Sequence, residues 1–187
     1  MSGTTGGGVA EDARARYDAG DFEAAHELAV AALAERPDDL LALRIAGRAS
    51  YELGLDDGPT HLSRAVELDP DDGETWHDLA VALVDAGRLG EAAEAFRGAQ
   101  RVRPGDASEL VDLGYAAYAT GTADEAIGYL RQAAERTPGS QAALRGLVDL
   151  NRREGRLDDA LAAAQQLAEH APDDVGAVLD VAELALE

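Results

Sequence analysis

One repeat length constrains how this chain can fold, because five prolines recur at intervals of 33, 34, 34 and 34 residues. These prolines are Pro37, Pro70, Pro104, Pro138 and Pro172. Five glycines keep nearly the same spacing, and they are Gly20, Gly54, Gly87, Gly121 and Gly155. A fixed period of this length indicates an array of small structural units, each of which buries its apolar face against its neighbours.

Each unit is predicted to be a pair of helices. The glycine separates two stretches of helical periodicity, and the proline follows the second stretch, where it prevents the helix from continuing. Both stretches of the third unit place apolar residues three and four positions apart, first Trp76, Leu79 and Leu83, then Ala92, Phe96 and Ala99. Two apolar stripes of this kind predict a helical hairpin in which the stripes face each other.

Composition agrees with an all-α fold. The sequence of 187 residues is 46% hydrophobic but only 4% aromatic, and alanine is abundant. This balance suits thin helices that pack closely, whereas a sheet relies on β-branched and aromatic side chains.

The one short interval lies between Gly54 and Pro70, where Gly58 and Pro59 begin the second helix of the second unit. Proline is tolerated in a first helical turn, so the hairpin is expected to persist there.

Small and large residues alternate in columns when the units are aligned on their glycines. In the first helices, one column holds the small residues Ala13, Gly47, Ala80 and Gly114. In the second helices, another column holds Ala25, Ala92, Ala126 and Ala160. Large apolar residues fill a neighbouring column: Val9, Leu43, Trp76, Leu110 and Leu144. Missing side chains let helices approach closely, so these columns are predicted to be the contacts between them.

These residues resemble the pattern of the tetratricopeptide repeat family. The third unit matches through Trp76, Leu79, Ala92, Phe96, Ala99 and Pro104, and the fourth through Leu110, Leu113, Gly114, Ala126, Leu130, Ala133 and Pro138. The resemblance covers nearly the whole chain. It implies a right-handed superhelical solenoid of antiparallel helix hairpins that binds other proteins.

The period divides the chain into a flexible Gly-rich leader at 1–8, five hairpins and a capping helix at 175–187. The hairpins are expected at 9–39, 40–72, 73–106, 107–140 and 141–174. In the last segment, Val178, Val181 and Leu184 have helical spacing. Its acidic residues Asp180, Glu183 and Glu187 are expected to solvate the open end of the array.

The sequence offers little chemistry for catalysis. The formal net charge of -21 argues against nucleic acid, whose phosphates would be repelled. There is no cysteine, and the four histidines show no His-x-x-x-His spacing, so neither a metal site nor a cofactor is expected. The start lacks the basic and apolar segments of a secretory signal, and no apolar run is long enough for a membrane span. We therefore expect a cytoplasmic protein that is not an enzyme and does not contact membranes.

The resemblance implies that the first helices line a concave groove through the positions ten, six and three residues before each turn glycine. The candidate partner-binding residues at these positions are Arg14, Tyr17, Arg44, Arg48, Tyr51, His77, Val81, Val84, Val111, Tyr115, Tyr118, Arg145 and Arg152. The 15 positions hold five arginines and one acid, so the groove floor inverts the charge of the whole chain. A wider window adds acids such as Glu52 and Asp78 and returns a mixed surface.

Two functional hypotheses follow. The first is an adaptor whose groove binds a peptide segment or helix of a partner protein, with arginines fixing carboxylates and Tyr and Val burying apolar side chains. The second is a structural scaffold in which the end helices of separate copies stack into a homo-oligomer.

Overall fold

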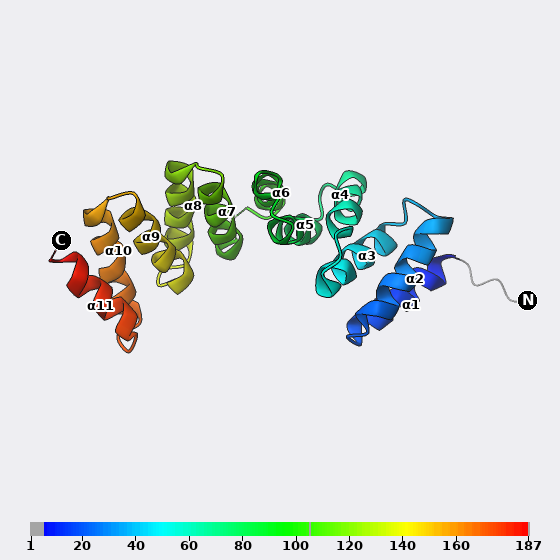
Figure 1. Cartoon of the computed structure of the whole chain (residues 1–187), viewed down its shortest axis with the longest axis horizontal. Helices are drawn as coiled ribbons and strands as arrows, with labels where there is room; N and C mark the ends of the chain where they lie inside the picture. Colours follow the sequence, from blue (N-terminus) through cyan, green and yellow to red (C-terminus); the bar gives the residue numbers. More distant parts are fainter. Residues whose placement is uncertain (1–5, 105, 187) are drawn as a thin grey trace, which may run out of the picture. The chain divides into compact units, whose positions relative to one another are not determined.

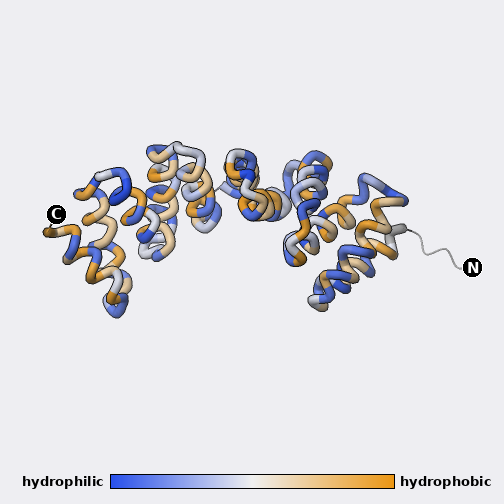
Figure 2. The backbone as a smooth tube through the Cα atoms, in the orientation of Figure 1, coloured by the Kyte–Doolittle hydropathy of each residue, from blue (hydrophilic) through white to orange (hydrophobic). Residues whose placement is uncertain are grey.

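The structure is a computed structural model that describes residues 6–104 and 106–186, and these residues form α-helices joined by short turns (Figure 1). The chain divides into two compact units, residues 1–102 and 103–187. The expectation of an all-α fold is therefore confirmed for the described residues. Figure 2 shows hydrophobic and hydrophilic positions alternating along the helices, as amphipathic helices require.

Unit 1 contains three consecutive helix pairs. Their bounds are α1 (Gly6–Asp18), α2 (Phe22–Glu35), α3 (Leu40–Leu53), α4 (Gly58–Leu68), α5 (Gly73–Asp85) and α6 (Leu89–Val102). Unit 2 contains two pairs and a final single helix. Their bounds are α7 (Ala107–Ala119), α8 (Ala123–Arg136), α9 (Gln141–Arg153), α10 (Leu157–His170) and α11 (Val175–Leu184).

The periodic glycines form the turns within the helix pairs. All five have a positive φ, between 66° at Gly54 and 86° at Gly121. Side chains disfavour this left-handed conformation, which is the reason that glycine ends each first helix. Gly58 and Pro59 begin α4 as expected, with Pro59 in the first turn, where its missing amide hydrogen is tolerated.

Aspartate or serine begins the first helix of each pair after α1. The side chains of Asp39, Asp72, Asp106, Ser140 and Asp174 accept hydrogen bonds from backbone amides of the first turn of α3, α5, α7, α9 and α11. These amides have no partner inside the helix, and such caps typically contribute about 1 kcal/mol each. The segment after each periodic proline therefore both stops one helix and starts the next.

The columns of small residues are the close contacts that the alignment predicts. Ala25, Ala92, Ala126 and Ala160 are fully buried. A Cβ atom added to Gly47 would lie 2.4 Å from Cγ of Leu62, and one added to Gly114 would lie 2.9 Å from Cγ of Leu130. No side chain larger than hydrogen fits at these two positions without a shift of the neighbouring leucine.

Both ends of the described chain differ from expectation. Helix α1 begins at Gly6, inside the predicted leader, and residues 1–5 lie outside the described residues. Glycine is tolerated there because the first-turn amides of any helix have no intrahelical partner. In α11, Asp180 and Glu183 pair with Arg152 of α9 at 3.5 and 3.1 Å, a contact that the sequence did not predict, and the Glu183 side chain remains 63% exposed. The remaining acid, Glu187, lies outside the described residues.

The apolar residues of α11 are divided between two faces. Ala177 and Leu184 are buried, and Val181 packs against the core of unit 2. Val178, which has helical spacing with Val181 and Leu184, is 49% exposed. Val175 and Leu179 are exposed as well. The outer side of this helix is consequently apolar.

Candidate functional site

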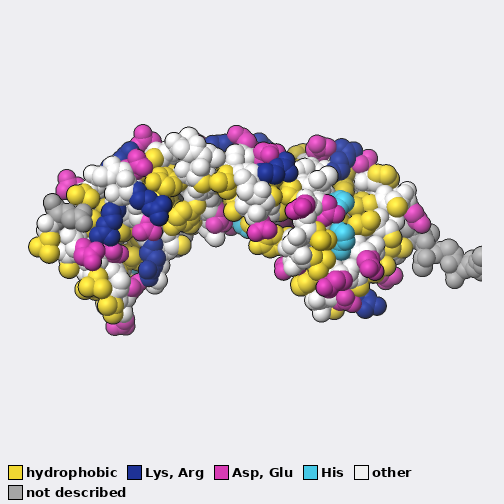
Figure 3. Space-filling view, in the orientation of Figure 1, with side chains coloured by type: hydrophobic (Ala, Val, Ile, Leu, Met, Phe, Trp, Pro, Cys, Tyr) yellow, Lys and Arg dark blue, Asp and Glu magenta, His cyan; other side chains and the backbone are white. Residues whose placement is uncertain are grey.

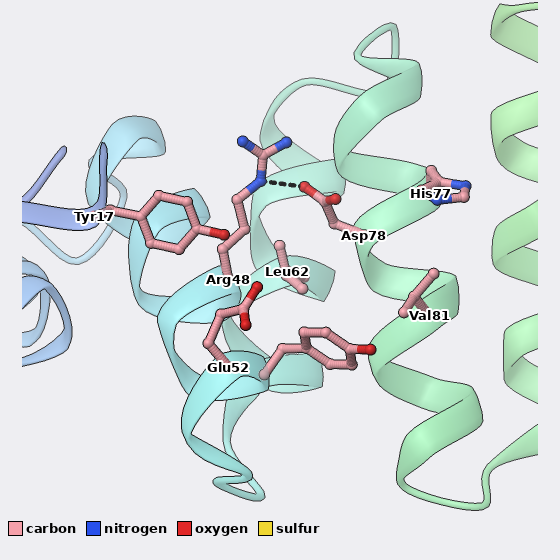
Figure 4. A pocket seen from close by; sticks show the side chains of 8 residues that line it. Tyr17, Arg48, Glu52, Leu62, His77, Asp78 and Val81 are labelled. Atoms are coloured by element: carbon pink, nitrogen blue, oxygen red, sulfur yellow. Dashed lines mark hydrogen bonds and ion pairs between the residues drawn. The ribbon is translucent and has the colours of Figure 1, made fainter. Parts of the chain in front are cut away.

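The first helices of unit 1 surround a hollow of about 150 Å³. Its lining residues come from α1, α3, α4 and α5, and they are Tyr17, Arg48, Tyr51, Glu52, Leu62, His77, Asp78 and Val81 (Figure 4). Successive first helices lie side by side in the stack, which places residues one repeat apart in sequence around one space. Five of the predicted groove residues meet here.

A second hollow of about 360 Å³ lies beside the first and shares Tyr17 and Arg48 with it. Its other lining residues are Arg14, Asp18, Leu41, Arg44 and Ile45, from α1 and α3. The two hollows together form a groove along α1, α3 and α5, which we call the unit 1 groove. It brings together seven of the predicted residues, namely Arg14, Tyr17, Arg44, Arg48, Tyr51, His77 and Val81.

The arginines of the unit 1 groove already have acidic partners. Nε of Arg48 faces the carboxylate of Asp78, and its Nη2 lies 3.6 Å from Glu74. Arg44 Nη1 lies 3.0 Å from Oδ2 of Asp72. The guanidinium nitrogens of Arg14 lie 3.9 and 3.8 Å from carboxylate oxygens of two acids on its own helix, Glu11 and Asp18. A carboxylate on the same or a neighbouring helix therefore accompanies each of these three arginines.

Burial and these charges set the ionisation of the groove. The pKa of Arg48 is raised: partial burial acts to lower it, but Asp78 outweighs that effect. The pKa of the Tyr17 hydroxyl is raised by burial and by the nearby Glu52 carboxylate. In Figure 4, the Tyr17 hydroxyl points toward the Arg48 stem, and Nε of Arg48 faces the Asp78 carboxylate.

His77 is partly a packing residue. Its ring meets Phe96 of α6 edge-on, with centroids 5.9 Å apart, and its Nδ1 atom is buried without a hydrogen-bond partner. It nevertheless remains one of the residues that line the first hollow. Leu62 of α4 was missed, since it belongs to a second helix and closes the bottom of the hollow.

The predicted residues of unit 2 are arranged differently. Val111 is only 7% exposed and belongs to the hydrophobic core, so it is not a surface residue. Tyr115 is 43% exposed, and burial together with Asp149 raises the pKa of its hydroxyl. The Tyr118 hydroxyl donates to Glu154 at 3.3 Å.

The two arginines of unit 2 that sequence reasoning selected are both paired. Arg145 pairs with Asp174, the cap of α11, and Arg152 pairs with Asp180 and Glu183. The structure therefore ties these arginines to the final helix. The hollow of about 350 Å³ in this unit lies elsewhere, between α8, α9 and α10.

A group that sequence reasoning did not single out lies on another face of unit 1. His26 of α2, Asp57 at the start of α4 and His61 of α4 place one ligand atom each within 4.8 Å of the others. The pKa of Asp57 is lowered: burial acts to raise it, but the Ser50 hydroxyl and the two imidazoles outweigh that effect. Figure 3 shows histidine side chains together at the surface of unit 1. Only the spacing Asp57-x-x-x-His61 could have suggested this group from sequence.

Comparison with known families decides the classification. One tetratricopeptide repeat model matches residues 11–72 and 56–107, and a second matches residues 117–184. The chain belongs to the tetratricopeptide repeat family. Members of this family are generally interaction modules without catalytic activity, so membership supports a role in binding proteins.

Solved tetratricopeptide repeat structures share the fold. A crystal structure of MamA superimposes with a TM-score of 0.84 at 21% identity, covering 94% of this chain and 96% of that one. YrrB gives 0.82 at 17% identity, covering 91% and 89%. A thermophilic protein of the same family from Thermus thermophilus gives 0.59 at 26% identity, covering 98% and 100%. No curated protein matches the chain.

Among the helices that the structure describes, none combines the length and the apolar character needed to cross a lipid bilayer.

Proposed function

We propose that the chain is an adaptor whose unit 1 groove binds a peptide segment of a partner protein. The observation that carries the proposal is the pair of adjoining hollows along α1, α3 and α5, which combine arginine donors with exposed tyrosine and valine. YrrB, which shares the fold, is described as having an unusual peptide-binding site. A shared fold supports only the general role of binding a peptide, whereas the side chains of the groove determine which peptide this chain would bind.

The ligand chemistry follows from what the groove leaves available. Tyr51 and Val84 are each 42% exposed and lie on the same side as the half-buried Val81. An apolar side chain of a ligand would bury surface there, at about 25 cal/mol per Å². Nη1 of Arg48, which is neither the nitrogen that faces Asp78 nor the one that faces Glu74, can receive a carboxylate. We therefore expect a peptide in which an apolar residue lies next to an acidic residue or a terminal carboxylate.

A displayed library of random peptides tests this proposal without assuming which protein is the partner. Selection on the full chain should enrich peptides with an apolar residue beside a carboxylate. The double variant Arg48→Gln with Tyr51→Ala should lose that enrichment, since it removes one donor and one apolar contact. The matched control is Arg145→Gln with Tyr115→Ala, which makes the same changes in unit 2. Identical selections by wild type and the unit 1 variant would contradict the proposal.

A second candidate function is self-association, and the apolar outer side of α11 favours it. Val175 is 70% exposed, Val178 49%, Leu179 55% and Leu186, just beyond the helix, 89%. Neighbouring exposed apolar residues of this kind are typical of interaction surfaces. Sedimentation equilibrium across a wide concentration range tests this candidate. A dimer that Val178→Glu with Leu179→Glu abolishes would support it, whereas a monomer at every concentration would remove it.

A further inference from the structure

We propose that His26, Asp57 and His61 form a binding site for a zinc ion on unit 1. The Nε2 atoms of both histidines lie 3.4 Å from the same oxygen, Oδ2 of Asp57. A tetrahedral zinc ion with bonds of about 2.0–2.1 Å separates its ligand atoms by about 3.3–3.4 Å. Two of the three separations between ligand atoms already have the value that this ion requires, and all three atoms lie within 4.8 Å of one another.

Hydrogen bonds leave two polar atoms of the group without a partner. Nε2 of His26 and Oδ1 of Asp57 are buried atoms without a hydrogen-bond partner. Buried polar atoms are rarely left unsatisfied, because each costs about 1–3 kcal/mol in general. A cation between the imidazoles and the carboxylate would satisfy Nε2 of His26, and the side chains of His26 and His61 are only 19% and 20% exposed.

Asp57 also differs from the other aspartates that begin helices. Asp21, Asp39, Asp72, Asp106 and Asp174 all accept hydrogen bonds from amides of the helices they start. The side chain of Asp57 makes no such bond to α4. Pro59 removes one of the first-turn amides, and the carboxylate lies against the two imidazoles instead. The short second repeat, which lacks one residue between Gly54 and Pro70, thus frees a carboxylate for another ligand.

The ligand set selects the class of metal. Two imidazole nitrogens and one carboxylate oxygen suit zinc and its neighbours among the late transition metals, whereas Mg²⁺ and Ca²⁺ prefer oxygen ligands alone. Zinc binding there would connect α2 of the first hairpin to α4 of the second. Three protein ligands leave a fourth position for water or for a side chain of a partner.

Titration of the untagged full chain with ZnCl₂, after removal of metals with a chelator, tests the proposal. We expect one zinc ion per chain and an increase of several degrees in the Tm with zinc but not with Mg²⁺. His26→Gln and His61→Gln should each weaken binding at least about tenfold. His170→Gln is the matched control, because this histidine is exposed and lies outside the group. Equal zinc affinity in wild type and His61→Gln would overturn the proposal, as would the absence of zinc binding by wild type.

Nitrogen NMR of the imidazoles keeps the test independent of how the variants fold. In the wild-type chain, zinc should shift the Nε2 resonances of His26 and His61 and leave those of His77 and His170 in place. Shifts confined to His170, or distributed equally over all four histidines, would mean adventitious binding to the acidic surface and would overturn the proposal.

Discussion

Arg44 on α3 lies 3.0 Å from the carboxylate of Asp72, and that same carboxylate caps α5. The relationship recurs in unit 2, where Arg145 on α9 pairs with Asp174, the cap of α11. Both arginines lie ten residues before a turn glycine, and both aspartates lie two residues after a periodic proline. Arginines selected as groove residues thus also connect consecutive hairpins, which gives them a part in stability.

The ion pair between Asp72 and Arg44 predicts that the unfolding free energy depends on pH. The pKa of Asp72 is lowered: partial burial acts to raise it, but the hydrogen bond from Thr75 and the charge of Arg44 outweigh that effect. A lowered pKa in the folded state means that ionised Asp72 stabilises the fold above the unfolded-state pKa of about 3.9, and that this contribution is lost as pH falls through the folded-state pKa. Asp72→Asn, which keeps a capping side chain, should therefore lower the unfolding free energy near neutral pH by up to about 1 kcal/mol.

Urea denaturation at several pH values checks this prediction. The difference between wild type and Asp72→Asn should disappear in strong acid. Asp71→Asn is the control, since Asp71 is the exposed neighbour of Asp72. A difference that stays constant at all pH values would show that the charge of Asp72 is not involved.

The ion pair of Arg48 and Asp78 predicts that exchanging the two charged residues restores stability lost when only Arg48 is changed. Both side chains are about one quarter exposed, at 28% and 24%. Arg48→Asp alone places a third carboxylate beside Asp78 and Glu74 and should cost about 1–3 kcal/mol of unfolding free energy. Arg48→Asp with Asp78→Arg should recover at least half of that loss. The same cycle at the exposed pair Arg64 and Asp38 should give a coupling of only about 0–1 kcal/mol. Equal couplings at the two pairs would contradict the prediction.

Ala126 predicts the cost of overpacking a close helix contact. Its side chain is fully buried, and its carbonyl oxygen would lie 3.2 Å from a Cβ added to Gly114. Ala126→Leu should lower the unfolding free energy by about 1–3 kcal/mol, since a larger side chain forces α7 and α8 apart. Arg14→Ala, an exposed change, should cost about 0.5 kcal/mol or less. Thermal melts followed by circular dichroism compare the two, and equal melting points would mean that the contact tolerates bulk.

Two glycines inside helices predict opposite effects of the same substitution. Gly47→Ala should destabilise by about 1–3 kcal/mol, because its Cβ would lie 2.4 Å from Cγ of Leu62. Gly128→Ala in α8 meets no atom within 4 Å and should stabilise by up to about 1 kcal/mol through helix propensity. Denaturation midpoints measure both, and a loss of stability in Gly128→Ala would contradict the second prediction.

The sequence by itself determined the repeat, the helix pairs, the turns at the periodic glycines and the close contacts at columns such as Ala126 and Gly47. These features depend on residues a few positions apart or on one period, so spacing along the chain is enough to predict them. Only the tertiary structure decided that Arg48 is paired with Asp78, that Val111 is buried and that His26 meets Asp57 and His61. These outcomes depend on which side chains neighbouring hairpins bring within a few ångströms. A shift of one residue, such as the one in the second repeat, changes that set without altering the pattern that predicts the fold.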